Sequence, residues 1–266
     1  MSTLEACHGG FGTIRLHSTP EASEHMTAAA IFDLDRTLIA ESSTPLFMRH
    51  LAAAGIGSES QVPFVDPIVR GVARGLKTIF DVVGESRLLM QPAKLAVRAS
   101  AGWNADAGEE ASQRAADEIA EHLLPFAKLR IEEHREAGDL LVLASTSPLA
   151  FTAPLADRLG FDAVIGTGWK RAADDADVCA GELEGAFVWG PATAHAVAEW
   201  CAENNVRLDR SSAYSDSYYD SPLLDLVGNP VAVNPDVRLQ ALAAVKGWPV
   251  RHLDKSAGIV KVAGRE

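Results

Sequence analysis

The sequence predicts an α/β protein in which a mostly parallel sheet has helices on both faces and carries an all-helical insertion after its first strand. From residue 28 onward, short apolar runs alternate with helical stretches, which is typical of parallel strands joined by helices. Between about residues 46 and 124 the alternation stops, and apolar residues recur at helical spacing instead. A chain of 266 residues is long enough for one large domain or two modest ones.

The elements of the first half follow from local signals. The continuous apolar run LLVLA is typical of a strand that is buried on both faces. Gly138 stands where a glycine commonly ends a helix, and Pro148 suits the first turn of the next one, although Pro154 interrupts it. The predicted order is strand 29–32, helix 126–137, strand 140–144, a helix from Ser147-Pro148, and strand 163–165.

The second half repeats this rhythm. Pro191 suits the first turn of a helix, and Gly228 ends a short helix that begins at Ser221-Pro222. The predicted strands are 212–215, 231–233 and 249–253, and the predicted longer helices are 191–203 and 235–244.

The insertion is predicted to be helical from two apolar stripes. They consist of Ile68, Val72, Leu76, Ile79 and Val83, and of Ala115, Ile119 and Leu123. Packing between helices explains the first stripe better than a lipid-binding face does.

Composition limits the classes of partner. Acidic residues outnumber basic ones by 36 to 24, and the net charge of −12 argues against general binding of nucleic acid or anionic membranes. Because a bound metal can reverse the local charge, a phosphorylated ligand is not excluded.

The first 27 residues lack the apolar segment of a secretory signal, and no apolar run approaches the roughly 20 residues of a membrane span. We expect a flexible tail over residues 1–27 and a cytoplasmic protein. The three separated cysteines fit a reducing compartment.

Reactive side chains follow three of the predicted strands. Asp33 and Asp35 come after the first, Ser145-Thr146-Ser147 after the second, and Asp216 and Asp220 after the strand at 212–215. Each group alone is also explained as a turn or a helix cap. Together they lie at the carboxyl edge of one parallel sheet, where ligands bind, and their oxygens suit Mg²⁺ and a substrate phosphate.

These motifs resemble the haloacid dehalogenase (HAD) superfamily. FDLDRTL resembles its first motif, LLVLAS its second, and AYSDSYYDSPLLDLVGNPVAVNPD its fourth, so that the resemblance covers residues 28 to 253. It implies a Rossmann-like core over 28–45 and 125–266 and a helical type-I (C1) cap over 46–124. A helical cap at this position resembles subfamily IB, the phosphoserine-phosphatase-like branch.

The resemblance also implies roles for individual residues. Asp33 would attack phosphorus to form an aspartyl-phosphate, and Asp35 would act as general acid and then as general base. Ser145 would bind a phosphate oxygen, with Thr146 as the alternative. Mg²⁺ would be held by Asp33, by the backbone carbonyl of Asp35 and by Asp216, with Asp220 supporting them. The implied activity is Mg²⁺-dependent hydrolysis of a small phosphorylated metabolite.

The sequence departs from the family in two places. The third motif is a lysine or arginine, whose expected position is Thr193, and no Lys or Arg occurs from 172 to 206. Lys170 could supply the charge from another location or be an ordinary loop lysine, and His195 is a weaker candidate. Secondly, Ser42 stands where phosphoserine phosphatases carry a glutamate, and Arg36 replaces a small residue. Arg36 and Ser42 are therefore candidate substrate-binding residues, and phosphoserine itself is not favoured.

Two other functions stay open. The missing lysine would suit a catalytically weak HAD-fold protein that binds phosphate and acts as a regulator. Transfer of the phosphoryl group to an acceptor other than water would use the same residues as hydrolysis. The oligomeric state is not determined by any of these patterns.

Overall fold

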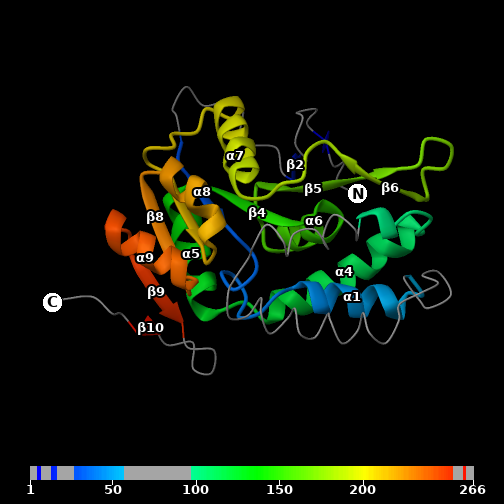
Figure 1. Cartoon of the computed structure of the whole chain (residues 1–266), viewed down its shortest axis with the longest axis horizontal. Helices are drawn as coiled ribbons and strands as arrows, with labels where there is room; N and C mark the ends of the chain where they lie inside the picture. The colour runs from blue at the N-terminus through cyan, green and yellow to red at the C-terminus, as the bar shows by residue number, and fades with distance from the viewer. Residues whose placement is uncertain (1–4, 7–12, 17–26, 57–96, 254–259, 262–266) are drawn as a thin grey trace.

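A computed structural model describes residues 5–6, 13–16, 27–56, 97–253 and 260–261 (Figure 1). The first apolar stripe of the predicted insertion, residues 68 to 83, lies outside the described residues. Among the described helices, none is long and apolar enough to cross a membrane.

Within the described residues, the centre of the molecule is a sheet of six parallel strands, which is extended by short antiparallel strands. β3 (Ala29–Phe32) pairs with β4 on one side and with β7 on the other, so the first predicted strand lies in the middle of the sheet. The parallel strands, in spatial order, are β5 (Ala163–Arg171), β4 (Leu140–Pro148), β3, β7 (Ser212–Ser215), β8 (Asn229–Val233) and β9 (Val250–Leu253). The antiparallel strands are β1 (Glu5–Ala6), β2 (Thr13–Arg15), β6 (Cys179–Glu184) and β10 (Val260–Lys261).

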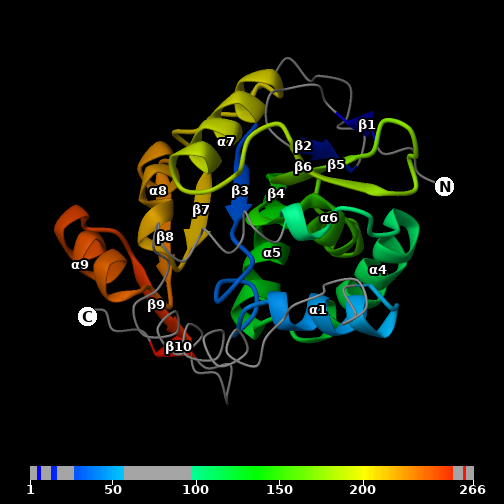
Figure 2. The same cartoon turned by 45° about the vertical axis from the view of Figure 1, so that its right-hand side comes forward.

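Helices cover both faces of the sheet. Successive residues of a strand point to opposite faces, and the apolar residues of β3 are buried on both. Ala30 and Phe32 belong to one buried cluster, together with residues of α1, α4, α5 and α6. Ala29 and Ile31 belong to the other, with residues of α7, α8 and α9. Figures 1 and 2 show the two groups of helices on either side of the strands. Their bounds are α1 (Thr44–Ala53), α4 (Ala105–Glu121), α5 (Pro125–Ala137), α6 (Leu149–Arg158), α7 (Pro191–Glu203), α8 (Ser221–Leu226) and α9 (Val237–Lys246).

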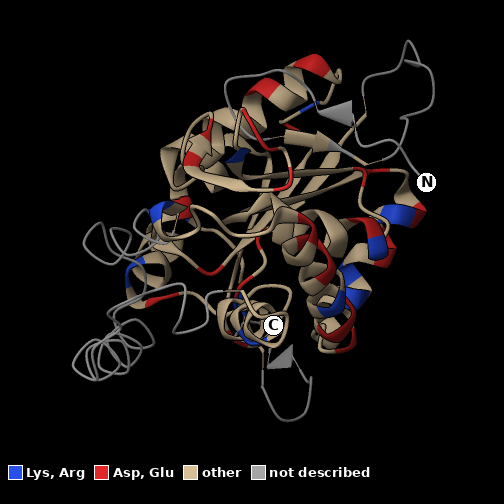
Figure 3. Cartoon of the chain, turned by 90° about the vertical axis from the view of Figure 1, so that its right-hand side faces the viewer, with Lys and Arg blue, Asp and Glu red and all other residues tan. Residues whose placement is uncertain are grey.

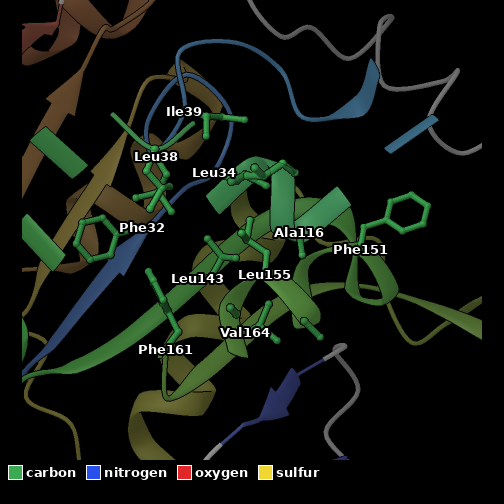
Figure 4. Packing of buried hydrophobic residues seen from close by; sticks show 14 of the residues in the cluster. Phe32, Leu34, Leu38, Ile39, Ala116, Leu143, Phe151, Leu155, Phe161 and Val164 are labelled. Carbon is green, nitrogen blue, oxygen red and sulfur yellow. The ribbon is translucent and has the colours of Figure 1, made fainter. Parts of the chain in front are cut away.

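Aromatic rings hold β3 to its neighbours inside the first cluster. Phe32 stacks on Tyr214 of β7 with ring centroids 4.6 Å apart and meets Phe161 edge-on at 5.8 Å. Figure 4 shows Phe32, Leu143 and Leu155 within this cluster. The Tyr214 hydroxyl is 2.8 Å from Nε2 of His134, whose Nδ1 is 2.7 Å from an oxygen of Asp139. The buried hydroxyl therefore has a polar partner, and β7 is fixed in register beside β3.

The described part of the insertion is helical, as the sequence predicted. α1 and α4 lie side by side in Figures 1 and 2, and α4 also packs on α6 of the core. Phe47 of α1 stacks on Phe151 of α6 with ring centroids 4.8 Å apart. The two connections between the insertion and the core lie close together, since Leu124 N–H donates to the Leu38 carbonyl at 2.9 Å. The exact domain boundaries at 45/46 and 124/125 stay a prediction.

Charged residues lie mainly on helices and loops. In Figure 3 the central strands carry almost no blue or red, whereas both colours alternate along the helices. This distribution agrees with strands that are buried on both faces.

Three predictions about the elements were incomplete. Thr13–Arg15, inside the tail expected over residues 1–27, pairs with β5 as strand β2. β5 continues to Arg171 instead of ending at residue 165, because its second half pairs with β6 in an antiparallel hairpin. β4 continues to Pro148, with an irregularity of register after Ala144, so Ser145 and Thr146 lie in its last part.

Gly228 and Gly108 form a matched pair for testing the core. A Cβ atom on Gly228 would lie 1.9 Å from the backbone oxygen of Asp209, which cannot move without the loop that precedes β7. On Gly108, within α4, the nearest atom would be Ile56 Cδ1 at an ordinary 3.8 Å. We expect Gly228→Ala to lower the free energy of unfolding by about 1–3 kcal/mol and Gly108→Ala to raise it by about 0.5–1 kcal/mol. Urea unfolding measures both, and equal stability of the two variants would contradict the packing described for β7.

Candidate active site

The end of β3 delivers Asp33 to the carboxyl edge of the sheet. Asp33 N–H donates to the carbonyl of Tyr214 at 3.0 Å, which keeps this residue in register with β7. A tight turn follows, in which the Leu34 carbonyl accepts from Leu38 N–H at 3.0 Å and from Ile39 N–H at 3.3 Å. Arg36 within the turn has a φ of 61°, a left-handed conformation that is uncommon for residues other than glycine. The turn therefore fixes Asp33, Asp35 and Arg36 relative to one another.

Asp35 is held by the chain that begins the helical insertion. Its Oδ1 accepts from Ser43 N–H at 2.8 Å, and its Oδ2 accepts from the Ser42 hydroxyl at 3.1 Å. Burial raises the pKa of the Asp35 carboxyl above its ordinary value, although these hydrogen bonds and the charge of Arg36 oppose the shift. A carboxyl with a raised pKa keeps its proton to higher pH, which suits a general acid.

Two further carboxylates come from the end of β7. Asp216 is only 3% exposed, and Oδ2 of its carboxylate lies 2.6 Å from a guanidinium nitrogen of Arg36. Asp220 lies in the 3₁₀ helix η1 (Tyr218–Asp220) and accepts from the Ser215 hydroxyl at 2.6 Å. The same hydroxyl oxygen accepts from Ser217 N–H at 3.1 Å, so Asp220 braces the loop that carries Asp216.

The end of β4 contributes hydroxyl groups. Ser145 is 5% exposed, and its Oγ accepts from Ser147 N–H at 3.2 Å. The Thr146 carbonyl accepts from the Thr167 hydroxyl at 3.1 Å, and the Thr167 oxygen accepts in turn from Val188 N–H at 3.2 Å. The irregular end of β4 is thus fixed to β5.

The structure places the other candidates elsewhere. Lys170 lies on the β5–β6 hairpin with 53% of its side chain exposed, and its ammonium is 3.3 Å from a carboxylate oxygen of Glu182. Thr193 is buried in α7, and His195 is exposed, 3.5 Å from Glu199. Ser42 contacts Asp35 directly, so its hydroxyl orients the predicted acid. Arg36 contacts Asp216, although the sequence assigned it only to substrate binding.

Sequence reasoning gave no role to Asn234 and Asp236, which support the cluster. Asn234 Nδ2 donates to the Arg36 carbonyl at 3.2 Å. Asp236 N–H donates to the Asp216 carbonyl at 2.9 Å, while its carboxylate accepts from Tyr218 N–H at 3.1 Å. Both residues lie in the segment NPD, which ends the stretch that resembled the fourth motif. That resemblance was the signal in the sequence that could have identified them.

The predicted ligands of a divalent cation follow β3 and β7, which are neighbouring strands of the sheet. Among the described residues, no three His, Cys, Asp or Glu side chains gather in a metal-binding arrangement. The predicted set has only two carboxylates, from Asp33 and Asp216, plus the Asp35 carbonyl. All its donors are oxygens, which hard cations prefer. A divalent cation would also satisfy the buried carboxylate of Asp216, which in this structure has the guanidinium of Arg36 beside it.

The raised pKa of Asp35 predicts how an uncharged variant behaves. Because the pKa is higher in the folded protein than in the unfolded chain, the contribution of Asp35 to stability is full below the ordinary value and is lost as the pH rises through the raised one. We therefore expect Asp35→Asn to raise the Tm of the metal-free protein at pH 7, with the gain shrinking toward pH 3.8. Thermal unfolding at several pH values measures this.

Asp225→Asn is the matched control, because Asp225 is an exposed acid that pairs with Lys246 at 2.7 Å. Its Tm should stay close to that of the wild type at every pH measured. A lower Tm for Asp35→Asn at pH 7 would show that the ionised carboxylate stabilises the fold, contrary to the direction stated here.

Comparison with known proteins identifies the family of the chain. Residues 30–225 match the family of haloacid dehalogenase-like hydrolases. The chain is 34% identical over 228 residues to phosphoserine phosphatase SerB1 of Mycobacterium tuberculosis, which covers 85% of this chain and 71% of that protein. It is 30% identical over 234 residues to a histidinol-phosphatase of Neisseria meningitidis, which covers 85% and 98% of the two chains. The structure of a Bordetella pertussis protein of unknown function matches at a TM-score of 0.66 and 27% identity, over 85% of this chain and 98% of that one. The chain therefore belongs to the haloacid dehalogenase-like hydrolase family, and its relatives include phosphatases.

Proposed function

We propose that this protein is a Mg²⁺-dependent phosphatase that hydrolyses a small organic phosphate through an aspartyl-phosphate. The observation that carries the proposal is the turn after β3, which holds Asp33 and Asp35 close together and on which burial raises the pKa of the Asp35 carboxyl. Two carboxyl groups whose environments differ can take the different roles of acid and nucleophile. The family match and the phosphatases among the relatives support the same reaction class.

The reaction divides into two steps. The Asp33 carboxylate attacks phosphorus and forms an acyl-phosphate bond, while the bond to the leaving oxygen breaks and Asp35 gives that oxygen its proton. Asp35, now ionised, takes a proton from water, whose oxygen attacks the phosphorus and releases phosphate and free Asp33. The Ser145 hydroxyl would donate to a phosphoryl oxygen. Ser42 and Ser43 N–H hold Asp35 in place through both steps.

Mg²⁺ is the cofactor that this ligand set would take. The Asp33 carboxylate, the Asp35 carbonyl and Asp216 would hold it, with Asp220 bracing the loop of Asp216. Bound there, it would neutralise part of the charge on the phosphate and on the acids.

The substrate class is a small phosphorylated metabolite. Relatives named for phosphoserine and for histidinol phosphate suggest a phosphate ester with an amino group. Phosphoserine itself is not favoured, because Ser42 replaces the expected glutamate and its hydroxyl is engaged with Asp35. A substrate panel should therefore contain amino-alcohol phosphates beside phosphoserine.

The charge of the third motif is a separate part of the proposal. Lys170 remains a candidate, although its partner Glu182 and its exposure suit a surface hairpin. If Lys170 neutralises the phosphate, Lys170→Ala should lower kcat by a factor of about 10²–10³. A change within about twofold would assign it to an ordinary surface ion pair.

Replacement of the nucleophile is the direct test of the activity. We expect Asp33→Asn to lower phosphate release by at least about 10³-fold, because the amide cannot form the acyl-phosphate. Phosphate release from the panel with Mg²⁺ measures the effect, and the unchanged Tm of a folded variant excludes unfolding as the cause.

Asp225→Asn again serves as the control, since it removes an exposed acid outside the cluster. Full activity of Asp33→Asn would overturn the proposed nucleophile. Absence of release from every ester by a folded, Mg²⁺-bound wild type would favour a phosphate-binding protein with little catalysis. Appearance of phosphorylated alcohols or sugars when these acceptors are added would reveal phosphotransfer.

A further inference from the structure

The backbone of Arg36 is fixed on both sides. Its N–H donates to the Glu41 carbonyl at 3.3 Å, and its own carbonyl accepts from Asn234 Nδ2 at 3.2 Å. Its φ of 61° is strained for an arginine, and such a conformation persists only where the surroundings impose it. The side chain therefore starts from a defined point on the turn that also carries Asp33 and Asp35.

The guanidinium of Arg36 lies against Asp216, with a nitrogen 2.6 Å from Oδ2. The side chain of Asp216 is 4% exposed and that of Arg36 is 22% exposed. A carboxylate buried to this extent is costly unless a positive charge accompanies it. In the metal-free protein, Arg36 supplies that charge.

The same carboxylate is a ligand in the metal set described above. A guanidinium in contact with Asp216 and a divalent cation on that carboxylate would repel each other, because both are positive and only a few ångströms apart. The two cations therefore compete for one carboxylate.

We propose that Arg36 is a built-in counter-ion that occupies the charge position of the divalent cation at Asp216 and must be displaced when the cation binds. The proposal rests on the Mg²⁺-dependent function proposed above. It explains how the buried Asp216 carboxylate remains stable before metal binding in a chain of net charge −12. The displaced guanidinium stays attached to the turn that follows Asp33. There it adds a positive charge, whereas Thr193, at the expected position of the third-motif lysine, is uncharged.

Competition makes the metal bind more weakly than its ligands alone would allow. If the ion pair is closed for most of the time, the apparent Kd for Mg²⁺ rises in inverse proportion to the fraction of open molecules. Removal of the guanidinium should then strengthen Mg²⁺ binding, whereas removal of a merely structural residue would weaken it.

Isothermal titration of the full chain with MgCl₂ tests this competition. We expect the Kd of Arg36→Gln for Mg²⁺ to be about tenfold lower than that of the wild type. Arg238→Gln is the control, because it removes a positive charge at the start of α9, where the guanidinium lies 3.8 Å from Asp236 and over the rings of Tyr218 and Tyr219. Its Kd should stay within about twofold, since Asp236, with which Arg238 pairs, is not one of the predicted Mg²⁺ ligands.

Thermal unfolding gives a second readout that does not depend on activity. In EDTA, Arg36→Gln should have a lower Tm than the wild type, because Asp216 loses its counter-ion. A saturating concentration of Mg²⁺ should then raise the Tm of the variant more than that of the wild type. Should Arg36→Gln not fold, Arg36→Gly replaces it, since glycine adopts a φ of 61° without strain.

The outcomes separate this inference from the proposed function. If the wild type binds Mg²⁺ and Arg36→Gln binds it equally or more weakly, the competition is overturned and the metal-dependent function stands. If Arg238→Gln tightens binding as much as Arg36→Gln, the effect is general electrostatics and the inference is again overturned. If neither the wild type nor Arg36→Gln binds Mg²⁺, both proposals fail.

Discussion

The position of β3 between β4 and β7 is the constraint on which the rest of the structure depends. Parallel pairing on both sides brings the carboxyl ends of three strands to one edge, although these ends lie far apart in the sequence. The stacked rings of Phe32 and Tyr214, and the contact of Tyr214 with His134, fix this pairing from within the core. A shift of β3 by one residue would move every side chain of the strand, and Asp33 with them, to the other face of the sheet.

The cost of this arrangement is electrostatic. Strand ends that gather acids at one edge place like charges together and remove some of them from water. Two features reflect this cost: burial raises the pKa of the Asp35 carboxyl, and the guanidinium of Arg36 pairs with the carboxylate of Asp216. Both features come from one turn of six residues, Leu34–Ile39, whose hydrogen bonds hold the acids and their counter-ion in fixed relation. Stability and the proposed chemistry thus depend on the same short segment.

Particular residues explain how much of this could be predicted. Asp33, Asp35, Asp216 and Asp220 could be predicted as site residues because each follows a predicted strand, and the structure shows that those two strands, β3 and β7, are neighbours. β2 was missed because its partner β5 lies far along the chain, and β6 was missed because it forms a hairpin with the second half of β5. Neither has a clear alternating pattern of its own. Lys170 was a candidate for the third-motif charge because it is a nearby basic residue upstream of the expected position. In the structure, the β5–β6 hairpin places its ammonium beside Glu182.

The sequence by itself determined the class of fold, the order of the parallel strands and the helices between them, the helical character of the described part of the insertion, and the acids at the strand ends. Local signals suffice there, because burial on both faces, helix ends and helical periodicity are written in neighbouring residues. Only the tertiary structure decided which side chains touch. The contact of Arg36 with Asp216 joins residues 180 positions apart, and it depends on a left-handed turn and on a neighbouring strand. Such a contact leaves no periodic trace in the chain, since it arises from packing between elements and not from preferences within one.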